Sequence, residues 1–294
     1  MTTAAAIINR ASRQLLSGTV EERNKLAATI QSGDTSVVVA YDLGSLRTGS
    51  VFEIESELLY IWEANQTTKT LTVERGYAGT TAASHASGTV CVVSPRFPRA
   101  QMLDAVNAEL DDLSSTASGL FQVVTASLSY NGSDRQLNLA GATDVLELID
   151  VRLRYLPDDY PIIRGARLQR DLPTADFAST FSIVFDDAVQ AGTIRVRYKS
   201  PFARATSESS DLTTFCGLPL TCDDLVELGV IIRMMAGREI KRSFTESQGD
   251  TRRAEEVPSG SSRDSISNLL RLRRDRITAE AGRLKAKYPI QFRK

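Results

Sequence analysis

The chain has 294 residues, of which 42% are hydrophobic and 24% charged, and its formal net charge is -1. This composition is that of an ordinary globular protein, so the global charge indicates no partner, and the length suggests roughly two domains. No apolar stretch approaches the roughly 18 residues of a membrane span, and the start MTTAAAIINR lacks the features of a signal peptide. We therefore expect synthesis in a cytoplasm and no membrane partner.

The first part of the chain predicts one helix followed by β structure. Residues 2–16 predict a short amphipathic helix, with Gly18 as a stop, because five apolar residues fall near one face at helical spacing: Ile7, Ile8, Ala11, Leu15 and Leu16. From Val37 onward, short β-branched and aromatic runs such as VFEIE and KTLTVE predict a small β module over about 34–94. The prolines of SPRFP, Pro95 and Pro98, end it.

A second helix and a second β-rich stretch follow. RAQMLDAVNAELDDL predicts a helix over 98–114 with one buried face, formed by Leu103, Val106, Leu110 and Leu113. After SSTASG, six or seven strand-like runs between about 121 and 202 predict a β-sandwich. In TIRVRYK the apolar residues alternate with Arg195, Arg197 and Lys199, as in a strand with one face in a core and one in water.

The C-terminal part is predicted to be helical. Thr221 and the acidic pair Asp223 and Asp224 suit the start of a helix over 221–242, whose sequence is apolar on nearly all sides. A polar, Gly/Ser-rich segment over about 243–263 follows. A last helix over 264–288 is expected to bury Leu270, Ile277 and Leu284, which are seven residues apart.

These elements predict an α+β fold in which a discontinuous helical bundle forms the core and two β modules are inserted into it, a small β-barrel-like module and a β-sandwich. The predicted boundaries are listed in chain order: an N-terminal helix at 1–18, the small β module at 19–94, a core helix at 95–116, the inserted sandwich at 117–214, and the C-terminal helices with a basic tail at 215–294.

The residues that could perform catalysis are few. The only histidine, His85, follows Ser84 directly, and side chains one residue apart rarely face each other as a nucleophile and its base must. GYAGTT lacks the lysine of a phosphate-binding loop, so Gly76, Gly79 and Gly88 are interpreted, with His85, as parts of a structural turn. Three cysteines and one histidine offer few zinc ligands. We therefore expect no catalytic residue, no metal and no cofactor.

The strongest electrostatic feature is the C-terminus. Residues 262–294 contain ten basic and three acidic residues, so this segment carries +7 and the remaining 261 residues carry -8. Such asymmetry indicates an acidic partner, although a solvated helix face remains an equal alternative. The candidate contact residues are Arg271, Arg273, Arg274, Arg276, Arg283, Lys285, Lys287, Arg293 and Lys294.

One stretch resembles a known module. Gly49-Ser50 precedes an acidic strand that ends in ELLYIW, and TLTVERGYAGT, His85 and the exit Gly88 follow. This pattern resembles a module that recurs in virion proteins of tailed bacteriophages, especially head-to-tail connector (neck adaptor) proteins. It covers about 60 residues. The end KYPIQFRK also resembles the tails with which connector proteins reach the portal, which makes Tyr288, Pro289, Ile290 and Phe292 candidate docking residues.

The resemblance implies a structural virion protein of the neck, made in the host cytoplasm, and not an enzyme. It further implies a homo-oligomeric ring, most often of twelve subunits, between the portal and a tail-completion or stopper protein, with DNA passing through the lumen without sequence-specific contacts.

Two rival functions remain open at this stage. The β-rich parts could belong to a baseplate or receptor-binding protein that recognises a host glycan, although the only tryptophan, Trp62, lies in a strand where we expect a core role. A hydrolase built on one of the adjacent acidic pairs is the second rival, and the lack of a complete catalytic constellation argues against it.

Overall fold

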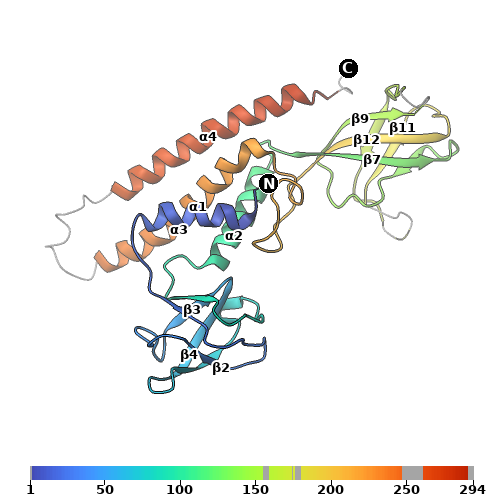
Figure 1. The fold of residues 1–294 in the computed structure, drawn as a ribbon. Helices are drawn as coiled ribbons and strands as arrows, with labels where there is room; N and C mark the ends of the chain where they lie inside the picture. The colour runs from blue at the N-terminus through green and yellow to red at the C-terminus, as the bar shows by residue number, and fades with distance from the viewer. Residues whose placement is uncertain (1, 155–158, 174, 176–179, 247–260, 291–294) are drawn as a thin grey trace.

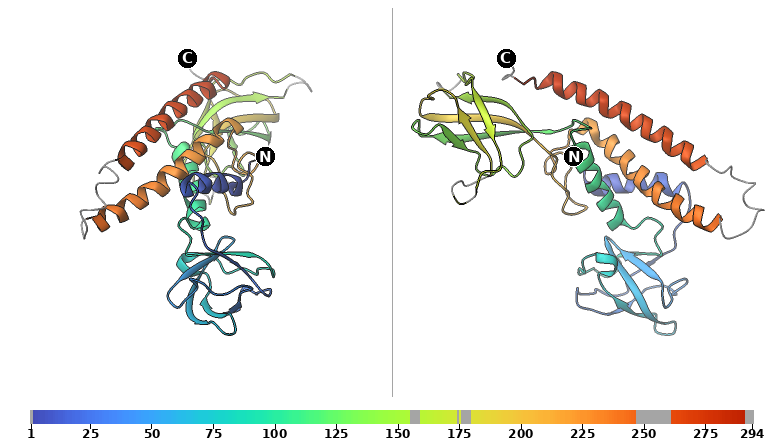
Figure 2. Two further views of the ribbon diagram at one scale, coloured as in Figure 1. Left: turned by 60° about the vertical axis from the view of Figure 1, so that its left-hand side comes forward. Right: turned by 180° about the vertical axis from the view of Figure 1, so that it is seen from behind.

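The computed structural model describes residues 2–154, 159–173, 175, 180–246 and 261–290, with the backbone alone for 237–246 and 261–265. In this part of the chain, four helices and twelve strands form three separate bodies (Figure 1). A curled β-sheet lies at one end of the molecule, four helices lie in the middle, and two small sheets lie to the side of the helices (Figures 1 and 2).

The N-terminal sheet has six antiparallel strands in the order β1-β6-β3-β4-β5-β2 and curls into a half-barrel. The edge strands are β1 and β2, and a single antiparallel β-bridge between Leu26, which follows β1, and Val39, which follows β2, brings the two edges together. Phe52, Ile54 and Leu71 are among the apolar side chains that fill its interior. Its strands are β1 (Arg23–Lys25), β2 (Ser36–Val38), β3 (Val51–Ile54), β4 (Glu57–Asn65), β5 (Thr70–Glu74) and β6 (Val90–Val93).

Two three-stranded antiparallel sheets share a second hydrophobic cluster, and we call this body the two-sheet lobe. The apolar residues of β12, Ile194, Val196 and Tyr198, lie in the cluster, so the alternating arginines lie on the opposite face of their sheet. One sheet contains β7 (Gln122–Tyr130), β12 (Gly192–Ser200) and β9 (Glu147–Leu153), and the other contains β10 (Ala166–Gln169), β11 (Ser182–Phe185) and β8 (Gln136–Asn138).

Helix α3 (Asp223–Glu246) packs against each of the other three helices: α1 (Ala4–Leu16), α2 (Arg99–Leu113) and α4 (Ser261–Lys287). The Thr3 hydroxyl caps α1 by accepting a hydrogen bond from the Ala6 amide. Ile7 and Ile8 of α1 and Val106 of α2 are fully buried, as the periodicity of both helices predicts.

The long helix α4 lies along α3 and buries little of its surface (Figure 2). Ile277 and Ala281 are its buried apolar residues in the part with described side chains. The expectation that Leu270 belongs to the buried stripe is wrong, because it is 44% exposed. The neighbouring Leu269 packs against the helices instead, since a helix period of 3.6 residues shifts the inward face away from a strict repeat of seven.

The expected architecture, a discontinuous helical bundle core that carries two inserted β modules, is wrong. The chain is a sheet-rich α+β protein with a curled six-stranded antiparallel half-barrel and four helices. The apolar residues of the described part divide into three clusters, two of which lie inside β structure, so the helices do not provide the core of the whole chain. Sequence periodicity shows which face of each helix is apolar but not how much of the chain packs on it.

Candidate functional site

The basic residues predicted on α4 fall into two groups. Arg271, Arg274, Lys285 and Lys287 are exposed, and Arg283 is 59% exposed beside Glu280. Arg273 and Arg276 instead pair with carboxylates on neighbouring helices. The structure therefore leaves five of the predicted contact residues exposed on the surface and uses the other two, Arg273 and Arg276, in contacts between helices. Arg293 and Lys294 lie outside the described residues.

Arg273 takes part in a cluster that joins three helices. Its guanidinium lies 2.7 Å from Glu109 of α2, whose side chain is 1% exposed, and also pairs with Asp112. Arg233 of α3 approaches Glu109 at 3.4 Å. Burial raises the pKa of Glu109, although both arginines act to lower it. A Cβ atom at Gly229 of α3 would lie 2.0 Å from the Glu109 carboxylate, so the missing side chain makes room for this cluster.

Arg276 joins α4 to the start of α3. Its Nε donates to Asp224 at 2.8 Å, and its Nη1 lies 3.2 Å from Glu280. The hydrogen bond to Asp224 raises the pKa of Arg276 above its ordinary value. Because Asp224 lies in the first turn of α3, it also faces the positive end of that helix. This pair links the middle of α4 to the first turn of α3 at the surface of the molecule.

The predicted docking tail is described in part. Tyr288 and Ile290 are half-buried, Pro289 is exposed, and the Lys287 ammonium lies 5.3 Å from the centre of the Tyr288 ring. Phe292 lies outside the described residues. The C-terminal end of α4 approaches the two-sheet lobe in all three views (Figures 1 and 2).

The turn between β5 and β6 is built around a buried ionic cluster. His85 is 3% exposed, and its ring nitrogens lie 2.9 Å from Glu55 and 2.8 Å from Glu57. Burial acts to raise the pKa of Glu57, but hydrogen bonds from Arg75, the Ala83 amide and His85 outweigh it and lower the pKa to about 2. These contacts hold the turn on the half-barrel and occupy both histidine nitrogens.

The glycines of this turn have the backbone angles that the sequence interpretation requires. Gly76, Gly79 and Gly88 have φ angles of 62°, 84° and 83°, a region in which a side chain is strained. A Cβ atom at Gly76 would also meet the Thr80 carbonyl oxygen at 2.7 Å. Within the described ranges, no group of three or more His, Cys, Asp or Glu side chains is arranged to hold a metal ion.

A buried carboxylate lies where the half-barrel meets α2. Glu53 of β3 is 3% exposed and accepts a hydrogen bond from the backbone N–H of Arg99 at 2.5 Å. The Arg99 side chain pairs with Glu208 rather than with Glu53. Burial raises the pKa of Glu53 to about 8, although the Arg99 hydrogen bond acts against this effect. Glu53 and Glu208 both line a pocket of ≈ 730 Å³ between the half-barrel and the helices.

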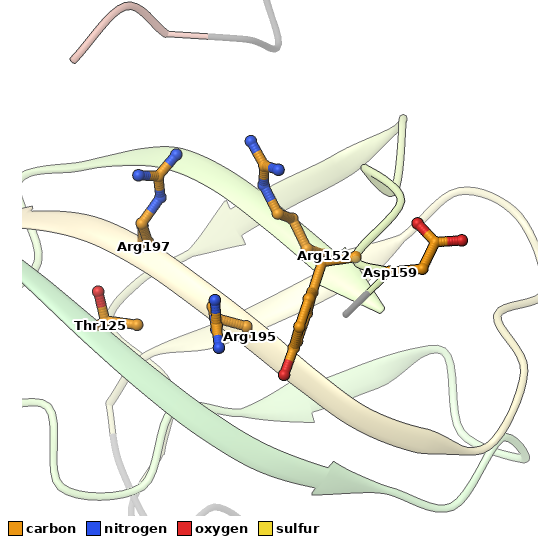
Figure 3. Close-up of a pocket in the computed structure, with 6 residues that line it drawn as sticks. Thr125, Arg152, Asp159, Arg195 and Arg197 are labelled. Atoms are coloured by element: carbon orange, nitrogen blue, oxygen red, sulfur yellow. The ribbon is translucent and has the colours of Figure 1, made fainter. Parts of the chain in front are cut away.

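Sequence reasoning did not identify a second basic site, which lies on the outer face of the β7–β12–β9 sheet. It is a pocket of ≈ 590 Å³ that we call the arginine pocket. Figure 3 shows its side chains standing on the face of the sheet, with the Asp159 carboxylate at one end and Arg197 at the other. The six lining residues are Thr125, Arg152, Asp159, Tyr160, Arg195 and Arg197.

The three arginines of the pocket have different partners. The Nε of Arg197 lies 3.0 Å from both oxygens of Asp150, a fully buried carboxylate, and Arg152 donates to Asp150 at 3.3 Å. Burial acts to raise the pKa of Asp150, but these two arginines lower it below its ordinary value. The Arg195 guanidinium lies 4.0 Å above the Tyr160 ring. Among the described residues, no carboxylate forms an ion pair with Arg195.

The only tryptophan is on the surface. We expected Trp62 to have a core role, and this is wrong, because it is 58% exposed. Its ring meets the ring of Tyr60 edge to face at 4.8 Å, and Tyr77 lies 5.3 Å from Tyr60 on the other side. A register shift between Ile61 and Glu63, where β4 pairs with β5, interrupts the alternation of inward and outward residues at this position.

No protein-family model matches the chain, and no curated protein sequence matches it. In the part of the chain that the structure describes, no helix has both the length and the apolar character needed to cross a membrane. The functional interpretation therefore depends on the arrangement of the residues themselves.

Proposed function

We propose that the chain is a non-enzymatic structural protein of a bacteriophage virion, a head-to-tail connector. In this proposal identical subunits form a ring between the portal and a tail-completion or stopper protein, and DNA passes through the lumen. The sequence of the half-barrel, with its TLTVERGYAGT turn, motivates the virion class. The open shape of the molecule supports assembly.

The observation that carries the proposal is the large surface of the chain. Its accessible area is 16887 Å² for a mass of 32.1 kDa, whereas a compact monomer of that mass exposes roughly 12,300 Å². The division of the described residues into three bodies with separate hydrophobic clusters contributes to this excess (Figure 1). A subunit of this shape offers different patches on its two sides, as a head-to-tail ring requires.

Helix α4 provides a surface suited to a protein partner. Leu272 is 54% exposed and Leu270 44% exposed, and both lie among exposed basic residues of the same helix. Apolar side chains interspersed with arginines are typical of protein interfaces, in which Arg is enriched and Lys depleted. We assign Arg271 and Arg274 to the contact with an acidic partner, the portal or packaged DNA.

The test measures assembly. The purified chain, alone and mixed with the portal protein of the same phage, is analysed by light scattering after size-exclusion chromatography and by electron microscopy. We expect rings, either spontaneously or on the portal, and we expect Leu272→Asp to abolish them. Ser267→Asp, which adds the same charge at another exposed position of α4, is the control. A chain that stays monomeric and does not bind its portal contradicts the proposal.

One observation favours the alternative of a baseplate or receptor-binding protein. The exposed Trp62 beside Tyr60 offers an aromatic surface with polar atoms at its edge, which suits contact with a sugar ring. A glycan array separates the two functions. Binding that Trp62→Ala abolishes would favour the receptor-binding function, whereas portal-dependent rings without glycan binding would favour the connector.

A further inference from the structure

We propose that the arginine pocket is a binding site for a phosphate group, either free or as part of a phosphodiester backbone. This inference does not depend on ring formation or on the basic surface of α4. It follows from the charges, the hydrogen-bond donors and the register of the strands that form the pocket.

The register of the sheet places two positive charges opposite each other. Arg195 of β12 pairs directly with Arg152 of β9, and both side chains line the pocket. Like charges directly opposite each other across a strand pair are destabilising. The neighbouring pair, Arg197 opposite Asp150, has the opposite charges that such a position favours. Arg152 also pairs with Asp150, whereas Arg195 has no carboxylate partner among the described residues, so an anion bound beside Arg195 would relieve the repulsion between the two arginines.

The carboxylates near the pocket do not balance its charge. Asp150 is shared by Arg197 and Arg152, so one carboxylate serves two guanidinium groups. Asp159 lies at the end of the pocket away from Arg197 and forms no ion pair with the three arginines among the described contacts (Figure 3). Tyr160 contacts Arg195 through its ring face, which attracts a cation but does not neutralise it. The pocket therefore retains a net positive charge.

The pocket is also rich in unused hydrogen-bond donors. The Nε of Arg152 is buried and has no hydrogen-bond partner. A buried donor without a partner is costly, which favours an acceptor that enters from outside. Arg195, Thr125 and Tyr160 line the same pocket and carry further N–H and O–H donors that an anion can use. A tetrahedral phosphate accepts several such hydrogen bonds, and arginine is well suited to bind it through two parallel bonds.

The dimensions and surroundings of the pocket fit either source of phosphate. Its volume of ≈ 590 Å³ lies within the range of about 300 to 1,000 Å³ of small-molecule sites. The exposed Lys285 and Lys287 lie at the end of α4 that approaches this lobe (Figures 1 and 2). A phosphodiester chain bound in the pocket therefore finds further positive charges nearby, whereas free phosphate does not need them.

The first experiment titrates the full chain with inorganic phosphate at constant ionic strength, measured by calorimetry. We expect saturable binding that Arg195→Gln weakens about tenfold, as expected when one charged hydrogen-bonding group is lost. Arg135→Gln is the matched control, because it removes the same charge from an exposed position of the same lobe outside the pocket. Unchanged thermal unfolding of both variants shows that the fold is intact.

The second experiment measures binding to a DNA duplex of about 20 base pairs at several salt concentrations by fluorescence anisotropy. We expect Arg195→Gln to weaken binding and to reduce the slope of log affinity against log salt by about one, with no such change in Arg135→Gln. Arg195-dependent binding of inorganic phosphate identifies a site for free phosphate. Arg195-dependent binding of the duplex alone identifies a site for phosphodiesters.

Three results would overturn the proposal. They are the absence of binding in both experiments, equal binding by Arg195→Gln and the unmodified chain, and a preference for a poly-glutamate peptide over both phosphate ligands. The last result would show that the pocket selects carboxylates.

Discussion

Glu109 of α2 is fully buried although a carboxylate is among the side chains least often found in that position. Two arginines from two other helices supply its partners, at 2.7 Å and 3.4 Å. The space for its carboxylate exists because α3 has a glycine at position 229. A helix interior disfavours glycine by about 1 kcal/mol relative to alanine, so the packing compensates for a local disadvantage.

We predict that Gly229→Ala destabilises the chain by about 1 to 3 kcal/mol, because the new Cβ atom would overlap with a carboxylate that two arginines hold in place. Urea denaturation measures the free energy of unfolding. The control is Gly282→Ala in α4, where no atom lies within 4 Å of the added Cβ. We expect Gly282→Ala to raise the free energy of unfolding by up to about 1 kcal/mol, because alanine has the higher helix propensity. Equal effects of the two substitutions would contradict the prediction.

Trp62 and Arg195 show how far the surroundings of a single residue can be predicted from the sequence. The aromatic character of Trp62 suggested a buried position, but the residue directly follows the buried Ile61 in β4, so the alternation of the strand places it on the outer face. The alternation in TIRVRYK does predict that Arg195 faces water. It gives no sign that Arg152, more than forty residues earlier, lies directly opposite, because register is a non-local property.

Helix α4 depends on charged pairs for its position. Few of its apolar side chains are buried, and Arg273 and Arg276 link it to α2 and α3. An ion pair on the surface contributes little to stability, whereas removal of one partner from a buried pair leaves an uncompensated charge. Arg273 belongs to the second class, because Glu109 is buried.

We predict that Arg273→Gln destabilises the packing of α4 by about 2 to 4 kcal/mol, because Glu109 then keeps only the more distant Arg233. Hydrogen exchange of the α4 amides measures this loosening. Arg274→Gln, which removes the same charge from the next, exposed residue, is expected to change stability by less than about 0.5 kcal/mol. Equal rates of hydrogen exchange of the α4 amides in the two variants would show that Arg273 does not stabilise the packing of α4.

The positions of the helices could be predicted from the sequence. The interval 98–114 was expected for α2, which covers Arg99–Leu113, because an apolar stripe at helical spacing is a local signal. The limits of this signal appear in α4, where Leu270 and Leu269 both fit an apolar stripe and only the packed structure distinguishes them.

Glu53 lies at the joint between two bodies, since β3 belongs to the half-barrel and its hydrogen-bond donor Arg99 begins α2. Its pKa is raised from 4.5 to about 8. Between these two pH values the folded chain holds a proton that the unfolded chain has released. The free energy of unfolding therefore falls as the pH rises through this window.

We predict that this loss is up to about 5 kcal/mol and that Glu53→Gln removes most of it, because the amide is neutral at every pH and still accepts the Arg99 hydrogen bond. Denaturation at both ends of the window measures the effect. Glu63→Gln, at an exposed position of β4, is the control and is expected to keep the pH dependence of the unmodified chain. A Glu53→Gln variant with the same dependence would contradict the prediction.

The architecture of the whole chain was the least predictable feature. The sequence shows that each helix needs a partner for its apolar face, and a common helical core was the simplest interpretation. The structure instead distributes the apolar residues over three clusters, and residues 202–218 of a loop fill part of the helical one. How many cores form depends on contacts between distant segments, which periodicity does not encode.

The packing of α1 has a consequence for folding during synthesis. Its amides at Ala4 and Ala5 bond to Ser210 and Glu208, and its buried isoleucines need α3, which begins at residue 223. At about 5 to 20 residues per second, a ribosome takes about 10 to 40 s to supply these partners. The half-barrel has all of its strands long before then. We therefore expect the half-barrel to fold before α1 is packed, while Ile7 and Ile8 stay uncovered and available to chaperones until α3 has been synthesised.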